Sequence, residues 1–335
     1  MRFVVLGAGA IGAYVGAALA RGGVDVTLVA RGEQLRALQE DGVQVLSGRG
    51  NFEARPPATG DWSVIGDADV VILGLKAYSL TAAAPRLGEL LRPGAAVVCA
   101  QNGIPWWYFQ SHGGDLDGLV LEAVDPGGVI ADSLPAAAAV GCVVYCSTEL
   151  VAPGVVRHLE GTRFSLGEPD RSVSERCNAI SDAFRAGGLK APVERDLRSE
   201  IWLKLLGNAT FNPISALTRA TLRELGTTDE MRTLLRATFD EIAAVAVRLG
   251  ITFPVSLDRR LEAGFAVGDH KTSMLQDLEN GKPLEYQCMT GAVVELARRL
   301  ELATPRLDTI HACIDLVDRL RAEQRATPLP DRVGV

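Results

Sequence analysis

Lys204, Asn208 and Asn212 recur at a spacing of four residues in a stretch otherwise rich in apolar side chains. In a helix, this spacing places all three along one face. Asparagine is a poor residue for a helix interior, and the set lacks the alternation of Glu and Lys found on ordinary exposed faces. A lysine and two amides on a stripe that faces a cleft could hold a carboxylate and a carbonyl oxygen. A solvated helix face is the alternative.

A glycine-rich motif near the start of the chain predicts a dinucleotide-binding turn. The apolar run Phe3–Leu6 is typical of a buried parallel strand, and GAGAIG follows it directly, before an alanine-rich helical stretch. Its first glycine permits a tight turn, its second lets the backbone approach a pyrophosphate, and its third lets the helix pack closely. The helix N-terminus then offers free N–H groups to phosphates. The cofactor-binding residues expected here are Gly7, Gly9, Ala10, Ile11 and Gly12. A purely structural turn is the alternative.

The residue after the second predicted strand, which runs from Asp25 to Ala30, indicates the kind of dinucleotide. NAD sites usually place Asp or Glu at this position to bind the ribose hydroxyls. Here the residue is Arg31. A guanidinium offers paired donors to phosphate oxygens, so the sequence favours the 2′-phosphate of NADP. A solvated arginine at a strand end is the alternative.

Two more polar residues follow predicted strands. Lys76 ends the buried run that begins near Asp67, and Asn102 follows a strand predicted over 95–100. In an open parallel sheet the ligand lies outside the carboxyl ends of the strands, so both residues are expected on the cofactor side. The alternatives are a surface lysine and a simple Asn-Gly turn.

Ser273 and Glu285 lie in the second half of the chain near predicted helix starts. Ser273 with Gln276 fits a capping box, so a structural role for the serine is as well supported as a ligand contact. Glu285 follows Pro283-Leu284 at the expected start of a helix over 284–300, where a carboxylate suits the helix dipole alone.

The composition indicates an ordinary soluble globular protein. The chain has 335 residues, 47% hydrophobic and 22% charged, with a net charge of -7. That length allows two domains, and the charge argues against nucleic-acid partners. No apolar run approaches the ~20 residues that span a bilayer, and no signal peptide is apparent, so a cytoplasmic protein without membrane partners is expected. The six scattered cysteines are expected to be buried free thiols, and no metal is expected.

The order of the predicted elements divides the chain into two domains. Strands and helices alternate up to about residue 195, with a helix over 171–187 and a last short strand over 190–194. Beyond that, only helices are expected, over 196–212, from Thr228 or Asp229 to Leu249, and over 254–267, 274–280, 284–300 and 305–323. The predicted domains are 1–195, an α/β Rossmann-type domain that binds the cofactor, and 196–325, a helical domain for substrate and catalysis. Residues 326–335 are expected to form a frayed tail.

An unusual segment at 104–139 contains four consecutive aromatic residues, Trp106 to Phe109. It is expected either as a loop whose rings cover the sheet edge or as a lid or wall at the mouth of the site.

Taken together, these motifs resemble the ketopantoate reductase (2-dehydropantoate 2-reductase) family over nearly the whole chain. They are GAGAIG at 7–12, Arg31, LK at 75–76, QNG at 101–103, PGxVxH at 153–158, WxKLxxNxxxNP at 202–213, and SMLQD at 273–277 with the later Glu285. The resemblance implies an N-terminal Rossmann-type NADP-binding domain and an all-helical C-terminal domain across a cleft, the arrangement known as 6-phosphogluconate-dehydrogenase-like.

The resemblance also implies an activity, the NADPH-dependent reduction of a 2-oxo acid, with 2-dehydropantoate as substrate and pantothenate biosynthesis as the setting. Lys204 would be the general acid, and Glu285 would orient both it and the substrate hydroxyl. The implied substrate ligands are Asn208, Asn212, Ser273 and Asn102, with Lys76 and Asn102 also on the nicotinamide side.

The aromatic segment at 104–139 departs from the family pattern and raises the alternative of a different, bulkier 2-oxo acid. A hydroxy-acid or opine-type NADP dehydrogenase is a rival function, but such an enzyme has no reason to place Lys204, Asn208 and Asn212 on one stripe. A non-catalytic NADPH-binding protein is a second rival. The sequence leaves open the physiological direction and the oligomeric state, including a homodimer.

Overall fold

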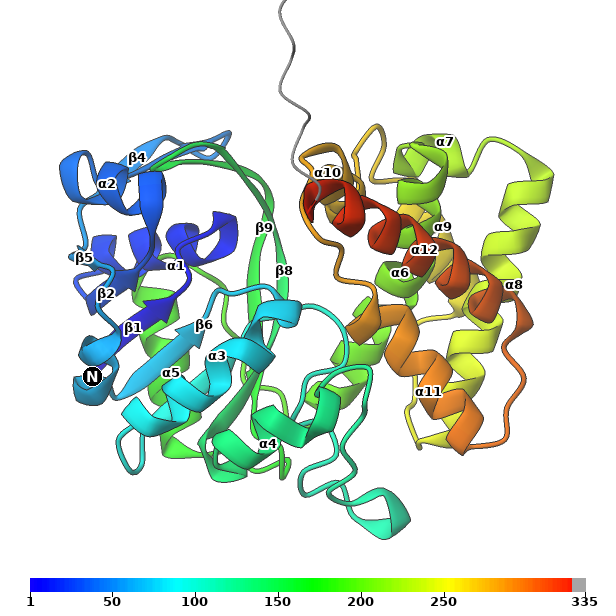
Figure 1. Ribbon diagram of the computed structural model, residues 1–335, viewed down its shortest axis with the longest axis horizontal. Helices are drawn as coiled ribbons and strands as arrows, with labels where there is room; N and C mark the ends of the chain where they lie inside the picture. The colour runs from blue at the N-terminus through cyan, green and yellow to red at the C-terminus, as the bar shows by residue number, and fades with distance from the viewer. Residues whose placement is uncertain (327–335) are drawn as a thin grey trace, which may run out of the picture. The chain divides into compact units, whose positions relative to one another are not determined.

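The structure is a computed structural model that describes residues 1–326 and divides into two compact units (Figure 1). The first unit is Met1–Ile201, and the second begins at Trp202. The division therefore falls within helix α6 (Leu197–Thr218) and not after residue 195, because this helix continues from one unit into the other. Of the tail expected over 326–335, Ala326 ends the last helix, and the rest lies outside the described residues.

The first unit is built on one mixed sheet in the order β4-β3-β9-β8-β7-β6-β1-β2-β5. From β5 to β8 all neighbours are parallel, and their order is that of a Rossmann sheet. β9 runs antiparallel to β8 and parallel to β3, and β4 is an antiparallel edge. The strands are β1 (Arg2–Leu6), β2 (Asp25–Val29), β3 (Val43–Ser47), β4 (Phe52–Ala54), β5 (Ala58–Thr59), β6 (Val70–Leu73), β7 (Ala96–Cys99), β8 (Ala139–Ala152) and β9 (Val155–Gly167).

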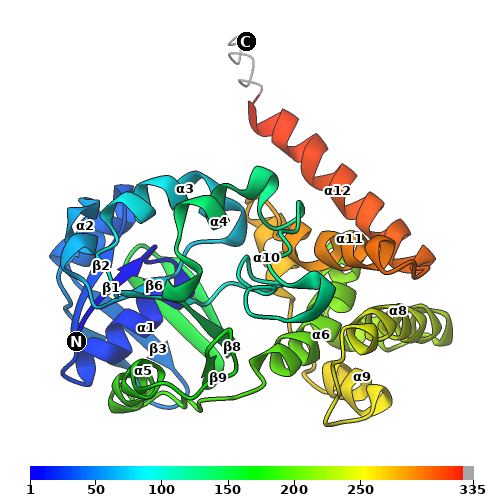
Figure 2. The same cartoon turned by 90° about the horizontal axis from the view of Figure 1, so that it is seen from below.

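Helices cover both faces of this sheet. Figure 2 shows α1 and α5 on one face and α3 and α4 on the opposite face. A parallel strand between two helical layers is buried on both sides, which is why β6 and β7 are apolar at every position and show no alternation. The predicted α/β fold class is confirmed. The helices are α1 (Ala10–Arg21), α2 (Gly32–Glu40), α3 (Ala77–Leu90), α4 (Val129–Ser133) and α5 (Glu175–Ala186).

Local boundaries differ from the sequence prediction at three places in this unit. The sequence predicts two strands after the turn at Pro153-Gly154, Val155–Leu159 and Arg163–Leu166, but the chain forms the single strand β9, with Gly161 at a positive φ of 71° inside it. The expected strand over 190–194 forms only isolated bridges. Helix α5 starts at Glu175 and not at 171, because the Ser174 side chain accepts a hydrogen bond from the N–H of Cys177 and so caps the helix.

The aromatic residues at the start of the 104–139 segment lie in the interior of the first unit. Trp107, Tyr108 and Phe109 are each no more than 1% exposed. A β-carbon at Gly141 of β8 would lie only 2.4 Å from the ring of Trp107, so this ring packs directly on the sheet. The structure therefore supports the loop alternative, in which the rings cover the sheet. They do not form a lid.

A buried arginine fastens this segment. Arg198, which is 2% exposed, donates from Nε to the carbonyl of Tyr108 (2.9 Å), from Nη2 to that of Gln110 (2.8 Å) and from Nη1 to that of Pro169 (2.7 Å). Burial lowers the pKa of its guanidinium. Three backbone acceptors from two separate loops thus depend on one side chain.

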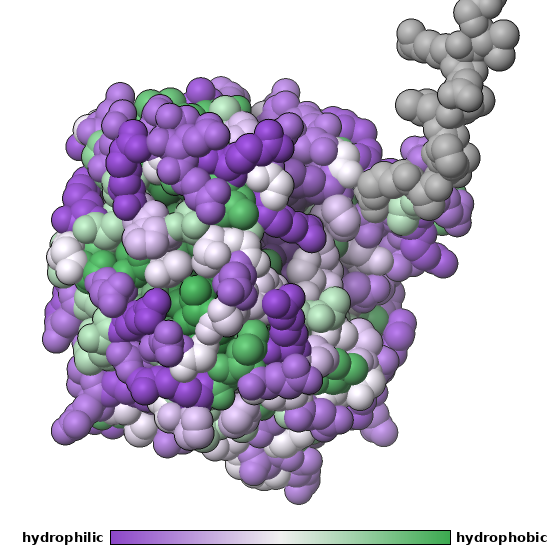
Figure 3. Space-filling model, turned by 60° about the vertical axis from the view of Figure 1, so that its left-hand side comes forward, coloured by the Kyte–Doolittle hydropathy of each residue, from purple (hydrophilic) through white to green (hydrophobic). Residues whose placement is uncertain are grey.

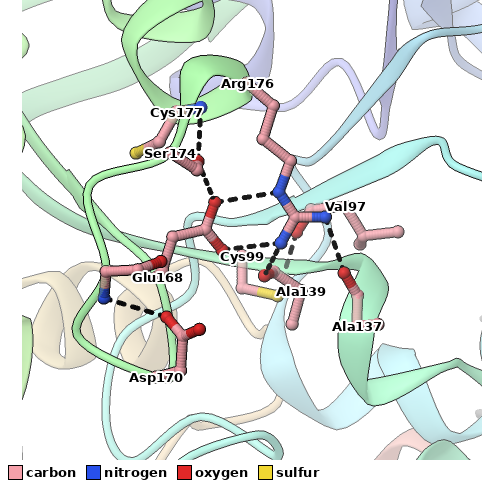
Figure 4. Close-up of polar contacts among 10 residues, drawn as sticks. Val97, Cys99, Ala137, Ala139, Glu168, Asp170, Ser174, Arg176 and Cys177 are labelled. Carbon is pink, nitrogen blue, oxygen red and sulfur yellow. Dashed lines mark hydrogen bonds and ion pairs between the residues drawn. The ribbon is translucent and has the colours of Figure 1, made fainter.

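The far end of the same segment is held by an ion pair (Figure 4). Arg176 donates to the carbonyls of Ala137 (2.6 Å) and Ala139 (3.3 Å) and pairs with Glu168 at 2.6 Å. Ser174 also donates to Glu168, and the hydrogen bond from Arg176 to Glu168 raises the pKa of Arg176. The carboxylate of Glu168 is almost fully buried, and these donors compensate for the cost of burying its charge.

The second unit consists of helices in the described residues. α8 packs on α9, α11 and α12, and the ring of Phe211 on α6 makes edge contacts with those of Phe239 and Phe265. The helix expected over 196–212 continues through Pro213 as α6, and the one expected over 284–300 is divided into a π-helical turn, Gln287–Gly291, and α11. The remaining helices are α7 (Leu222–Leu225), α8 (Asp229–Arg248), α9 (Leu257–Phe265), α10 (Ser273–Glu279), α11 (Ala292–Arg299) and α12 (Pro305–Ala326).

The expectations that the composition raised concern the surface, membrane spans, metal sites and cysteines. The face in Figure 3 is mostly hydrophilic, with separate hydrophobic patches. Within residues 1–326, no helix is both long and apolar enough to cross a membrane, and no three His, Cys, Asp or Glu side chains are placed to hold a metal ion. None of the six cysteines forms a disulfide bond, and burial raises the pKa of Cys99 and Cys177 to about 12. Cys146 is only partly buried and Cys313 is exposed, so the expectation of buried thiols is wrong for these two residues.

Replacing Arg198 with methionine should destabilise the protein by about 3–5 kcal/mol, because three buried carbonyls lose their donors. Unfolding in urea measures this free energy. The matched control is Arg195→Met on a neighbouring exposed arginine, which should change stability by no more than ~0.5 kcal/mol. Equal stabilities of the two variants would show that the hydrogen bonds of Arg198 to these carbonyls do not stabilise the fold.

Candidate active site

The glycine-rich turn connects β1 to α1, and two of its glycines are required by contacts within the protein. Gly7 has a φ of +98°, and a β-carbon there would lie 2.9 Å from the backbone nitrogen of Leu75. A β-carbon at Gly12 would lie 2.1 Å from the carbonyl oxygen of Gly7. The tight turn and the close helix packing predicted for these positions are therefore present.

Gly9 differs from both of its neighbours in the motif. A β-carbon at this position would meet nothing within 4 Å, and its φ of −73° is open to any residue. No contact in the protein therefore requires glycine here. The open space in front of its backbone fits a ligand that approaches the turn closely, as a pyrophosphate does.

The donors around this space belong to the first turn of α1. The N–H groups of Gly7 and Ala8 both donate to the carbonyl of Val29, and the first bond of α1 runs from Ala13 N–H to the carbonyl of Gly9. The N–H groups of Ala10 and Ile11 thus lie at the helix start, where no intrahelical acceptor exists. With the positive end of the helix dipole, they could hold phosphate oxygens.

Arg31 lies two residues after the end of β2, at the N-cap position of α2, and its side chain is exposed. This is the end of the second strand, where the ribose of a dinucleotide bound at the turn would be expected. An exposed guanidinium next to a helix N-terminus suits a phosphate group.

Lys76 and Asn102 occupy equivalent positions on adjacent strands. Leu73 of β6 pairs with Cys99 of β7 in parallel register, and each of the two residues lies three positions beyond its paired residue (76 − 73 and 102 − 99). Leu73 also pairs with Leu6, which directly precedes the glycine turn. Both side chains are half-buried. The first unit therefore gathers its predicted residues at the carboxyl edge of one sheet.

The predicted polar stripe lies on one continuous helix of the second unit. α6 includes Lys204, Asn208 and Asn212, and its Trp202, Leu205 and Leu206 are buried. Lys204 and Asn208 are half-buried, and Asn212 is 6% exposed. The stripe is therefore not an ordinary solvated face. Asn212 Nδ2 lies 4.0 Å from Sδ of Met289, at the edge of a weak hydrogen bond, and so contacts the π-helical turn.

Glu285 lies two residues before this turn and is 6% exposed. The prediction that it starts a helix is wrong, since the chain enters the π turn only at Gln287. Its neighbours are held on α12: the N–H of Leu284 donates to Asp318 (3.2 Å) and the hydroxyl of Tyr286 to Asp315 (2.7 Å). Burial, together with Asp315, raises the pKa of Tyr286 to about 12. A buried carboxylate thus has a fixed backbone position.

Ser273 is the first residue of α10, and it is exposed. The capping box predicted for it is wrong: Thr272 is the N-cap, and its side chain accepts from the N–H of Leu275 at 3.3 Å. Thr272 has the extended backbone that a cap needs, whereas Ser273 is already helical. Among the described contacts none joins Ser273 to α6.

Sequence reasoning missed Arg260 of α9. Its Nε donates to the carbonyl of Leu203 (3.1 Å), and a β-carbon at Gly207 would lie 2.6 Å from its Nη2. Leu203 and Gly207 each directly precede a residue of the polar stripe, Lys204 and Asn208, so the guanidinium packs against α6 beside the stripe. A glycine inside a predicted helix was the available signal of such a close approach.

Comparison with known proteins gives consistent matches along the chain. The family model described as "Ketopantoate reductase PanE/ApbA" matches residues 3–171, and "Ketopantoate reductase PanE/ApbA C terminal" matches residues 196–318. The chain is 45% identical to a 2-dehydropantoate 2-reductase from Mesorhizobium japonicum (97% of this chain, 99% of the relative). It is 30% identical to one from Halobacterium salinarum (95% and 99%). A solved 2-dehydropantoate 2-reductase from Geobacter metallireducens superposes with a TM-score of 0.82 at 27% identity (94% and 99%).

Alanine substitutions at two glycines should separate binding from folding. Gly9→Ala should leave the melting temperature within a few degrees of the wild type and weaken nicotinamide dinucleotide binding by roughly tenfold or more, because the methyl group enters the open space. Gly12→Ala should destabilise the fold by about 1–3 kcal/mol or more, because the methyl group meets the carbonyl of Gly7. Thermal unfolding and nucleotide titration measure both. Wild-type affinity in Gly9→Ala would contradict the assignment of the turn.

Proposed function

This chain belongs to the ketopantoate reductase family, whose members are pyridine-nucleotide-dependent oxidoreductases, and we propose that it reduces 2-dehydropantoate to pantoate with NADPH. The resemblance inferred from its motifs is confirmed by these matches. The observation that carries the proposal is the half-buried stripe of Lys204, Asn208 and Asn212 on α6, because it provides an ammonium and two amides within the matched C-terminal region.

The proposed role of Lys204 follows from the charge that the reaction creates. NADPH, when bound, supplies the hydride that reduces the substrate carbonyl at C2. The carbonyl oxygen then gains negative charge and must be stabilised and protonated. An ammonium group does both, and general acid catalysis of this kind contributes typically 10²–10⁴-fold to a rate. Lys204 is the residue of the stripe that can donate this proton.

The other residues of the second unit would bind and orient. The amides of Asn208 and Asn212 can donate to substrate oxygens, and the exposed hydroxyl of Ser273 can donate to the carboxylate. Glu285 is a buried carboxylate on a fixed backbone, which suits the proposed orientation of Lys204 and the substrate hydroxyl. Arg260 adds a positive charge on α6 beside the face that carries Lys204.

The cofactor side of the proposal depends on the first unit. The open space at Gly9 and the donors of Ala10 and Ile11 fit a pyrophosphate, and Arg31 fits the 2′-phosphate that distinguishes NADPH from NADH. Lys76 and Asn102 would line the nicotinamide side, at the edge that their strands share with the turn.

The burial of the aromatic rings counts against the alternative of a bulkier substrate. That alternative depended on the aromatic segment forming a wall of the site, and its rings are buried in the first unit. The direct test is NADPH oxidation with ketopantoate beside a panel of larger 2-oxo acids. Turnover of ketopantoate in preference to the panel supports the proposed substrate, and turnover of a larger acid alone contradicts it.

Lys204→Ala should lower kcat by about 10²–10⁴-fold, because it removes the proton donor, and should leave the dissociation constant for NADPH within about twofold. Steady-state kinetics and NADPH titration separate the two quantities. Lys190→Ala, on an exposed lysine of the first unit, is the matched control and should retain full activity. An equal loss of turnover and of nucleotide binding, or no loss of turnover, would count against the catalytic assignment and favour a non-catalytic binding protein.

Arg31→Ala should raise the KM for NADPH by roughly 10–100-fold and leave the KM for NADH nearly unchanged, because only NADPH carries the 2′-phosphate. The measurement is the ratio of kcat/KM for the two cofactors. Arg36→Ala, on an exposed arginine of the same helix, controls for a general loss of positive charge. A parallel change for both cofactors would show that Arg31 does not recognise the 2′-phosphate.

A further inference from the structure

The motif PGxVxH at 153–158 forms the turn between β8 and β9 and the start of β9, and it holds none of the proposed catalytic or binding residues. Its Gly154, at a φ of +75°, packs against α2: a β-carbon there would lie 3.2 Å from the β-carbon of Ala37. The carbonyl of Gly154 accepts from the N–H of Gln44 in β3 at 2.8 Å. The packing against α2 and the hydrogen bond to β3 thus fix the position of this turn.

One side chain joins this turn to the glycine-rich loop. Gln34 of α2 accepts on Oε1 from the N–H of Gly154 (2.9 Å) and donates from Nε2 to the carbonyl of Ala8 (2.8 Å). The bond from Gly154 decides which end of the amide faces the loop. Because an N–H can point only at an acceptor, Oε1 is directed to Gly154, and the donating end is left for Ala8.

The carbonyl of Ala8 belongs to the same planar peptide unit as the N–H of Gly9. In a trans peptide these two groups point in opposite directions. Gln34 holds the carbonyl from one side, and the Gly9 N–H is therefore directed away from Gln34. Gly9 is also the position of the motif where a β-carbon would meet only open space. The bond from Gln34 thereby sets the direction of a donor at the pyrophosphate approach.

The other end of the motif supports α1, the helix that starts at this loop. The ring of His158 stacks on that of Tyr14 with centroids 4.9 Å apart and planes within 5°. His158 Nε2 donates to the carbonyl of Gly161 (2.5 Å), and Nδ1 is hydrogen-bonded to the Ser47 hydroxyl (2.9 Å). One end of the motif is therefore joined to the glycine-rich loop through Gln34, and the other end contacts α1, the helix that would bind the phosphates.

We propose that Gln34 is a positioning residue for the cofactor: with its amide oriented by Gly154, it fixes the peptide between Ala8 and Gly9 so that the Gly9 N–H donates to the pyrophosphate. This inference rests on the proposed function only in that its ligand is a nicotinamide dinucleotide. It assigns a role to the turn of the PGxVxH motif: the turn orients the side chain of Gln34, and Gln34 in turn positions the glycine-rich loop.

The test is Gln34→Met, which keeps the length of the side chain and its helix propensity but removes both hydrogen bonds. The dissociation constant and KM for NADPH should rise about threefold to tenfold. The kcat at saturating NADPH should stay within twofold, and the melting temperature should match that of the control. Gln39→Met is this control, because Gln39 lies on the same helix and donates to the carbonyl of Ala58, away from the turn.

A second pair of variants adds the same charge at both positions. Gln34→Glu keeps the acceptor for Gly154 but sets a carboxylate oxygen against the carbonyl of Ala8, so NADPH should bind more weakly than to Gln39→Glu. If both Gln34 variants bind NADPH as their Gln39 controls do, the inference is overturned while the proposed function stands. If the wild type binds neither NADPH nor NADH, both fail. A drop in kcat without a change in NADPH affinity would also overturn the positioning role.

Discussion

The carbonyl oxygen of Gly7 lies so close to its surroundings that neither Gly12 nor Gly74 could carry a side chain. A β-carbon at either position would approach it to 2.1 or 2.2 Å. This crowding brings the end of β1, the first turn of α1 and the end of β6 together. The N-terminus of α1, the segment that leads to Lys76 and the strand end before Arg31 then share one edge. The proposed cofactor site depends on this contact because it places all its donors.

Arginine side chains that donate hydrogen bonds to backbone carbonyls fix the position of a second part of the first unit. Arg198 and Arg176 hold the two ends of the segment 104–139 through four hydrogen bonds to its main-chain oxygens, two from each arginine. A long segment with little regular structure leaves such oxygens without partners, and a buried guanidinium satisfies several of them at once. The aromatic rings can then remain buried on the sheet.

The helical unit positions Glu285 through a chain of contacts that starts far from it. The buried carboxylate of Glu241 on α8 accepts from the N–H groups of Arg306 and Leu307, which have no intrahelical acceptor because they lie at the start of α12. α12 in turn binds the residues on either side of Glu285 through Asp315 and Asp318. A carboxylate that is proposed to orient Lys204 is thus held by its neighbours in sequence and by two further helices.

Features that depend on local pattern could be predicted from the amino-acid sequence. The glycine motif, the strand-end residues Lys76 and Asn102 and the spacing of the α6 stripe each follow from a period or a turn that neighbouring residues specify, as does the α/β class. The remaining features required the folded chain, because they depend on partners distant in sequence. Examples are the hydrogen bond from Arg198 to the carbonyl of Tyr108, which holds the aromatic residues, and the approach of Arg260 to Gly207. The link from Gly154 through Gln34 to Ala8 joins residues 146 positions apart (154 − 8), and no local pattern could have specified it.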